Sequence, residues 1–170
     1  AEGAREKRNL PSLRKLFGGL KGELEILDEV SGETLIGLAY TGPFDHLEAQ
    51  QREDGVSPFP MATGQGKTAA GSHVSLAWSD VTGGEGSGIV HIAPGCGTED
   101  YGLGLENDLP VVAPLDPAGI FLDGFGTLAG QPVSDASQAV IEDLRQRGLL
   151  VAKERYNHVY PHCWRCSTEL

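Results

Sequence analysis

Residues 86–100 read GSGIVHIAPGCGTED, and this stretch joins a candidate strand to a candidate helix. The apolar run at 88–93 is followed by a proline and a glycine-rich turn, after which Thr98 can cap a short helix. Such a layout often holds a small ligand at the carboxyl end of a strand. The stretch lacks the third glycine of a dinucleotide fingerprint, and the chain has no Gly-Lys-Ser/Thr phosphate loop.

Further short strands are predicted on both sides of this stretch. Each is an alternating or apolar run bounded by glycine, proline, aspartate or asparagine. The candidates are residues 23–30 and 34–37, joined as a hairpin, and residues 73–81, 110–115 and 149–160. Several short strands with frequent turns favour a barrel or a packed sheet. The predicted fold class is therefore mainly β, with short peripheral helices.

Two more helices and one long loop are predicted. Asp135 can cap a helix whose apolar positions follow at helical spacing, and Gly148 stands where a left-handed end is needed. Residues 10–17 also follow helical spacing, up to the glycine pair that comes next. Residues 50–72 are rich in glycine and proline and poor in large apolar side chains, which predicts a long, mobile loop.

The 170 residues suit one loop-rich globular domain, with 24 glycines and 10 prolines. The net charge is −11, and nearly all of the acidic excess lies at 23–144, whereas 1–22 and 145–170 are basic. An acidic centre repels a phosphate backbone, so the chain ends or a larger parent protein would have to hold any nucleic acid. The alternative is an acidic surface that only aids solubility. No apolar run suits a membrane span or a secretion signal, so we expect a cytoplasmic protein without a membrane partner.

Three cysteines cannot build the even disulfide framework of a small secreted domain, which favours a reducing compartment. Cys163 and Cys166 form a Cys-x-x-Cys, which supplies two of the four ligands of a structural zinc site. His158 and His162 could complete the set, but an orphaned half-site or plain thiols are favoured over that set and over a redox pair. Cys96 is interpreted as structural, because no His/Asn partner pattern supports a nucleophile.

Asp100 and His91 are the candidate functional side chains near the glycine turn. In the first turn of a helix, Glu99 and Asp100 would meet the positive end of the helix dipole, which keeps a carboxylate ionised. An ionised carboxylate at the rim of a pocket can hold an ammonium group. The alternatives are that both acids only stabilise the helix terminus, and that His91 is a core or pocket-wall residue.

Several stretches of the chain closely resemble isoleucyl-tRNA synthetases. They are residues 86–101, residues 109–116 (LPVVAPLD) and residues 160–170 (YPHCWRCSTEL), with residues 37–44 (GLAYTGPF) as a further match. The resemblance covers about residues 34–170 and lies in the family's editing insertion. Valyl and leucyl enzymes share part of this plan, but the Cys-Trp-Arg-Cys ending and the Val-His-Ile-Ala-Pro string favour the isoleucyl branch.

The resemblance implies a β-barrel editing domain at 23–160, between a basic segment at 1–22 and the start of a zinc-ribbon half-site at 161–170. Such a domain hydrolyses Val-tRNA(Ile), an error that arises because one methylene group discriminates poorly between isoleucine and valine. By match to the family motif, Asp100 would bind the α-ammonium group of the misattached amino acid, and His91 would line the side-chain pocket and exclude isoleucine. The implied substrate-binding residues are Gly86, Ser87, Gly88, Gly97 and Thr98, with serine at 87 where the family commonly has threonine.

The reaction implied is ester hydrolysis by a positioned water, assisted by the terminal ribose hydroxyl, with no cofactor for editing. The family's threonine-rich segment and its earlier Cys-x-x-Cys are absent, so structural zinc is expected only in the parent protein. ATP-binding signatures are also absent, so the chain is not expected to form the aminoacyl adenylate of the parent ligase. Three hypotheses result. The first is an editing fragment that acts on tRNA(Ile) charged with valine beside the rest of the synthetase chain. The second is a non-catalytic module for RNA positioning or structure, and the third is a Cys-x-x-Cys metal protein.

Overall fold

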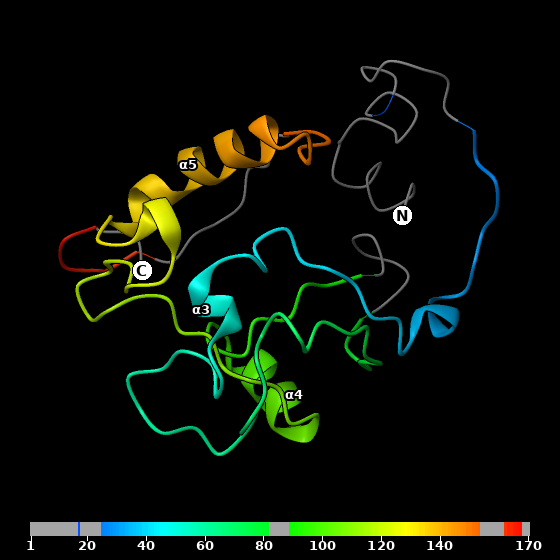
Figure 1. The fold of residues 1–170 in the computed structure, drawn as a ribbon, viewed down its shortest axis with the longest axis horizontal. Coiled ribbons are helices and arrows are strands. Elements are labelled where there is room, and N and C mark those ends of the chain that lie inside the picture. Colours follow the sequence, from blue (N-terminus) through cyan, green and yellow to red (C-terminus); the bar gives the residue numbers. More distant parts are fainter. Residues whose placement is uncertain (1–16, 18–24, 82–88, 154–161, 168–170) are drawn as a thin grey trace.

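The structure is a computed structural model that describes residue 17 and residues 25–81, 89–153 and 162–167. In this part of the chain the helical elements are η1 (Gly32–Leu35), α3 (Glu48–Gln51), α4 (Thr98–Glu106), η2 (Gly126–Leu128) and α5 (Val133–Gln146). Figure 1 shows α3 close to α4, whereas α5 runs along another side of the molecule. No helix in the described ranges is both long enough and apolar enough to cross a membrane.

The predicted β-barrel, and with it the mainly β fold class, is wrong. No described residue belongs to a continuous strand, and the extended segments pair through isolated bridges, among them Ala39–Val74, Val56–Val112, Leu115–Phe121 and Ile120–Pro132. A barrel needs continuous ladders that close on themselves. Isolated bridges between loops cannot provide that closure.

Prolines explain why one candidate strand does not grow into a ladder. In the segment predicted as a strand at 110–115, Val112 pairs with Val56 through hydrogen bonds from Val56 N to Val111 O (2.9 Å) and from Ala113 N to Val56 O (2.7 Å). Pro110 and Pro114 flank this bridge, and neither has an N–H group to extend the pairing. The pairing therefore stops after one bridge.

The other candidate strands also form no ladder in the described residues. Residues 73–75 lie antiparallel to residues 37–40, with hydrogen bonds that include Ser75 N to Leu38 O at 3.0 Å. The hairpin predicted around Ser31 does not form, because η1 takes up its turn and the first two residues of its second arm, Thr34 and Leu35. Residues 25–30, 89–93 and 149–153 carry no bridge assignment. The other residues of these candidate strands, 23–24, 88 and 154–160, lie outside the described residues.

Local sequence signals located both longer helices. α5 begins two residues before Asp135, with Pro132 at its N-cap, and Gly148 follows it at φ 68°, the left-handed end that the glycine predicted. α4 begins at Thr98, one residue earlier than predicted, because Gly97 rather than Thr98 is the N-cap residue. The helix predicted at 10–17 lies outside the described residues except for Phe17.

The core is small and forms where residues from α3, from the loop at 50–72 and from the segment before η2 pack together. Ala49, Val56 and Phe125 are buried together, with partly buried apolar neighbours that include Phe121, whose ring lies 5.8 Å from that of Phe125. Small cores contribute limited burial energy, so polar contacts matter more for holding the loops.

The loop at 50–72 is fixed by contacts to the carboxyl end of α4. Thr63 is buried, and its hydroxyl lies 3.1 Å from both Gly104 O and Leu109 O. Nearby, Lys67 Nζ lies 2.7 Å from a carboxylate oxygen of Asp108. These contacts dock the tip of the loop on the turn that follows α4.

Candidate functional site

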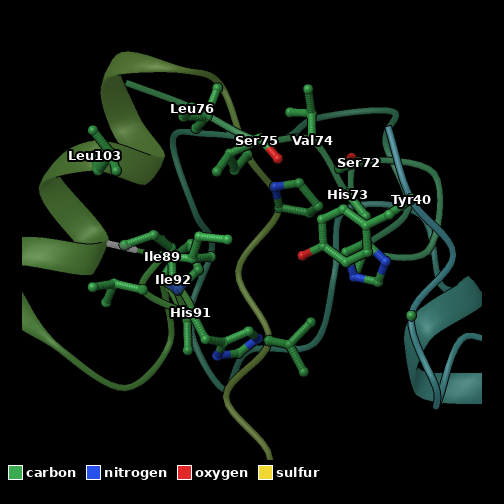
Figure 2. Close-up of a pocket in the computed structure, with 18 of the residues that line it drawn as sticks. Tyr40, Ser72, His73, Val74, Ser75, Leu76, Ile89, His91, Ile92 and Leu103 are labelled. Atoms are coloured by element: carbon green, nitrogen blue, oxygen red, sulfur yellow. The ribbon is translucent and has the colours of Figure 1, made fainter. Parts of the chain in front are cut away.

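A cavity of about 1230 Å³ lies between several segments of the chain. Its walls come from the turn at 40–45, from residues 72–78 and from residues 89–96, and residues of 109–114 also line it. Figure 2 shows Ile89, His91 and Ile92 on one wall, and Tyr40 and His73 on another. The lining is mostly apolar, with a few ionisable groups, which is the usual character of a small-molecule site.

His91 lines this cavity, as the sequence hypothesis requires for a wall residue. Its side chain is exposed rather than packed in a core. Ile89 and Ile92 line the same wall, so the imidazole lies among aliphatic side chains. Its role in excluding a larger side chain remains a prediction.

Asp100 lies at the start of α4, but its carboxylate turns back over the glycine bend. Oδ2 accepts a hydrogen bond from Ala93 N at 3.3 Å, and a Cβ atom placed on Gly97 would lie 3.2 Å from that oxygen. Asp100 is not among the residues that line the cavity. In this conformation its carboxylate joins the bend at 93–97 to the helix.

The remaining predicted substrate-binding residues divide into two groups. Gly97 is the N-cap of α4 and Thr98 is exposed at its first position, and neither lines the cavity. Gly86, Ser87 and Gly88 lie outside the described residues. The structure therefore places His91 in the cavity wall, whereas Gly97, Thr98 and Asp100 do not line the cavity.

Cys96 also lines the cavity, next to this bend. Burial raises the pKa of its thiol, and the negative charge of Asp100 raises it further. A thiol with a raised pKa stays protonated at neutral pH, and only the thiolate is a good nucleophile. The raised pKa disfavours Cys96 as a nucleophile, whereas its structural role stays a prediction.

The described residues provide no complete zinc site. Cys163 is half-buried and Cys166 is exposed, while His162 Nδ1 lies 3.2 Å from Ser167 O. No group of three or more histidine, cysteine or carboxylate side chains in the described ranges is arranged to hold a metal ion. Tetrahedral zinc needs four ligands, and His158 lies outside the described residues, so the zinc half-site at Cys163 and Cys166 stays a prediction.

The sequence hypotheses missed a carboxylate–imidazole pair in the cavity wall. Asp45 Oδ1 lies 3.2 Å from His73 Nδ1, and the ring of Tyr40 stacks on that of His73 with 5.0 Å between centroids and 6° between planes. All three residues line the cavity with His91. The only local signal was the turn Gly42–Asp45, since an aspartate that closes a turn is held in a fixed orientation. No spacing rule pairs it with a histidine so far along the chain.

Comparison with curated proteins identifies the family. The isoleucine–tRNA ligase of Methanothermobacter thermautotrophicus is 38% identical over 148 residues, which is 87% of this chain and 12% of the relative. That of Carboxydothermus hydrogenoformans is 34% identical over 155 residues, or 91% of this chain and 14% of the relative. The chain is homologous to a segment of isoleucine–tRNA ligase.

A shorter match is closer in sequence. The isoleucine–tRNA ligase of Kosmotoga olearia is 52% identical over 82 residues, which is 48% of this chain and 9% of the relative. No family model matches the chain. The resemblance to isoleucyl-tRNA synthetases is thus confirmed, and this isoleucine–tRNA ligase segment spans about one eighth of the length of the first relatives.

Proposed function

We propose that this isoleucine–tRNA ligase segment takes part in editing, by hydrolysing the ester bond of Val-tRNA(Ile). The proposal is supported by the position of His91 in the wall of a cavity of about 1230 Å³. The motif around His91 resembles the family's editing insertion. Apolar neighbours on that wall suit an aliphatic side chain such as that of valine. The cavity is large enough to admit an amino acid with part of a ribose.

The reaction needs a positioned water and no covalent intermediate on the protein. Water attacks the ester carbonyl carbon, and the ribose oxygen leaves with a proton. Cys96 is kept protonated by its surroundings, which fits a mechanism without a thiol nucleophile. Positioning of the ester and the water would supply most of the rate.

In this proposal Asp100 binds the α-ammonium group of the substrate. Its carboxylate would have to give up the hydrogen bond from Ala93 N, which at 3.3 Å is a long one. A substrate ammonium group is a charged donor and forms a stronger bond than a neutral amide. Binding of the substrate can therefore drive this exchange.

A second candidate is a module that positions RNA or supports structure without catalysis. It is favoured by one observation, which is that Asp100 faces the glycine bend and does not line the cavity. In this case Asp100 only ties α4 to the preceding bend. Under both candidates we propose tRNA(Ile) and the rest of the synthetase chain as partners in the cytoplasm, with any structural zinc completed by that remainder.

Deacylation of Val-tRNA(Ile) by the chain distinguishes the two candidates. The editing proposal predicts release of valine above the spontaneous rate, and loss of that release in Asp100→Ala. Glu99→Ala is the matched control, since Glu99 is exposed on the same helical turn. A folded chain that releases no valine would refute the editing proposal and support the non-catalytic module.

His91→Ala tests the role of the cavity wall separately. Removing the imidazole enlarges the space beside the substrate side chain, so hydrolysis of correctly charged Ile-tRNA(Ile) should appear. If selectivity between the two aminoacyl groups is unchanged, His91 does not line the side-chain pocket during the reaction.

A further inference from the structure

The pair formed by Asp45 and His73 is held in place by three independent contacts. Asp45 Oδ2 accepts a hydrogen bond from Gly42 N at 2.7 Å, which fixes the carboxylate over its own turn. The backbone of Tyr40 donates to His73 O at 3.3 Å, and the two side-chain rings are stacked. Figure 2 shows this stack at the cavity. The imidazole therefore has little freedom to turn away.

Gly42 leaves room for this pair because it has no side chain. A Cβ atom at this position would lie 2.5 Å from both Asp45 Oδ1 and His73 Cε1, which is far inside contact distance. Any other residue at 42 would push the carboxylate and the imidazole apart. The turn and the pair thus depend on each other.

The surroundings of the imidazole determine which nitrogen carries the hydrogen. Nδ1 is buried, lies 3.2 Å from the Asp45 carboxylate and has no hydrogen bond of good geometry. A lone pair on Nδ1 would face a negative oxygen without solvent, whereas an N–H at Nδ1 is attracted to it. In neutral His73 the hydrogen therefore belongs on Nδ1, which leaves the lone pair on Nε2. A carboxylate beside one ring nitrogen also fixes the orientation of the imidazole.

The other ionisable side chains that line the cavity are less suited to accept a proton from water. Glu33 is exposed on η1, and Asp45 is engaged by Gly42 N and His73. Cys96 is protonated, and His91 lacks an orienting carboxylate within ion-pair distance among the described residues. His73 combines partial burial, with 25% of its side chain exposed, and a fixed partner.

We propose that His73, oriented by Asp45, is the proton acceptor for the water that hydrolyses the aminoacyl ester. This inference rests on the proposed editing function and adds a residue to it. As the water oxygen bonds to the ester carbonyl carbon, its proton passes to Nε2. When the bond between that carbon and the ribose oxygen breaks, the imidazolium returns the proton to the ribose oxygen. The products are the free amino acid and the uncharged tRNA end, and His73 is regenerated.

Single-turnover hydrolysis of Val-tRNA(Ile) by the whole chain tests the assignment. His73→Gln keeps a polar side chain but cannot accept the proton, so the rate constant should fall by about 100-fold or more. His46→Gln is the matched control, because His46 is exposed close to the same turn. Free imidazole should restore part of the activity of His73→Ala, which a purely structural role would not allow.

Asp45 is a positioning residue, and Asp45→Asn tests that role. The amide can donate to Nδ1 and so favours the wrong tautomer, which should lower the rate constant about 10- to 100-fold with little change in KM. The nitrogen chemical shifts of His73 report the tautomer without any activity. A hydrogen on Nδ1 in the unmodified chain is expected, and a hydrogen on Nε2 would overturn the inference.

The outcomes separate this inference from the editing proposal. If the unmodified chain releases valine and His73→Gln does so at the same rate, His73 is not the proton acceptor and editing stands. If the unmodified chain releases none, the editing proposal and the catalytic part of this inference both fail. Release that depends on His73 and is rescued by imidazole supports both.

Discussion

Replacing Thr63 by valine tests whether a single buried hydroxyl holds the long loop on α4. Thr63 is 2% exposed, and its Oγ1 lies 3.1 Å from Gly104 O and 3.1 Å from Leu109 O. A hydroxyl has one hydrogen, so the two carbonyl groups share it. Valine has nearly the same shape, so the substitution removes the hydrogen bond without opening a void.

The size of the effect depends on which hydrogen-bond donors each carbonyl group keeps in Thr63→Val. Gly104 O also accepts Leu109 N at 2.9 Å, so it keeps one partner in Thr63→Val. Leu109 O loses its donor and is only partly buried. An unsatisfied buried group costs about 1–3 kcal/mol, and partial access of water places this one toward the lower end. The expected loss in the free energy of unfolding is therefore about 1–2 kcal/mol rather than the sum for two broken bonds.

Urea denaturation followed by tryptophan fluorescence and circular dichroism measures this loss. With ordinary denaturant slopes, the midpoint of Thr63→Val should fall on the order of 1 M. Thr63→Ser keeps the hydroxyl and loses one methyl group, which should cost about 1 kcal/mol or less. Thr41→Val is the control for an exposed threonine. If Thr63→Val unfolds at the wild-type midpoint, or is more stable than Thr63→Ser, the hydroxyl does not hold the loop.

Three further predictions concern the same region and the cavity. Gly64→Ala and Gly66→Ala both place alanine at positive φ (70° and 72°), but only the new Cβ at Gly64 would clash with backbone, at 2.2 Å from the Cα atom of Pro110. Gly64→Ala should therefore unfold at a clearly lower urea concentration than Gly66→Ala, and equal midpoints would contradict this. The neighbouring lysine and a backbone N–H hold the pKa of Asp108 below its usual value, so this carboxylate stabilises the fold above about pH 4 and loses that effect as the pH falls through its folded-state pKa. The difference in urea midpoint between wild type and Asp108→Asn should therefore shrink from pH 6 toward pH 3, and a constant difference would refute it. Cys96 should react slowly with iodoacetamide at neutral pH and faster in Asp100→Asn, because removing that charge lowers the pKa of the thiol; an unchanged rate would show that Asp100 does not act on it.

The two longer helices, α4 and α5, could be predicted because their signals are local. Gly148 ends α5 and Thr98 begins α4, and each needs only its neighbours along the chain to act. The exact N-caps, Pro132 and Gly97, differ from the predicted Asp135 and Thr98, which is the usual uncertainty of helix ends.

Pairing between strands could not be predicted in the same way. Periodicity at 110–115 and 73–81 indicates extended backbone, and both segments are extended in part. Whether extended segments form a ladder depends on partners elsewhere and on free N–H groups. Pro110 and Pro114 lack those groups on both sides of Val112, so the pairing predicted for this segment does not extend into a ladder.

In the candidate site, too, local motifs could be predicted from the sequence, whereas contacts between distant segments could not. The motif at 86–100 located His91, which lines the cavity, but could not show that the Asp100 carboxylate turns toward Ala93 N. The pair of Asp45 and His73 was invisible in the sequence, since a carboxylate and an imidazole far apart along the chain form no recognisable spacing.

The sequence by itself determined the family, the two longer helices and the glycine bend that leads into α4, because each depends on short runs of residues. The tertiary structure alone decided which side chains share the cavity, which carboxylate faces which partner and how the long loop is docked. These are distances between segments, and the chain settles them only when the small core and the few buried hydrogen bonds bring those segments together.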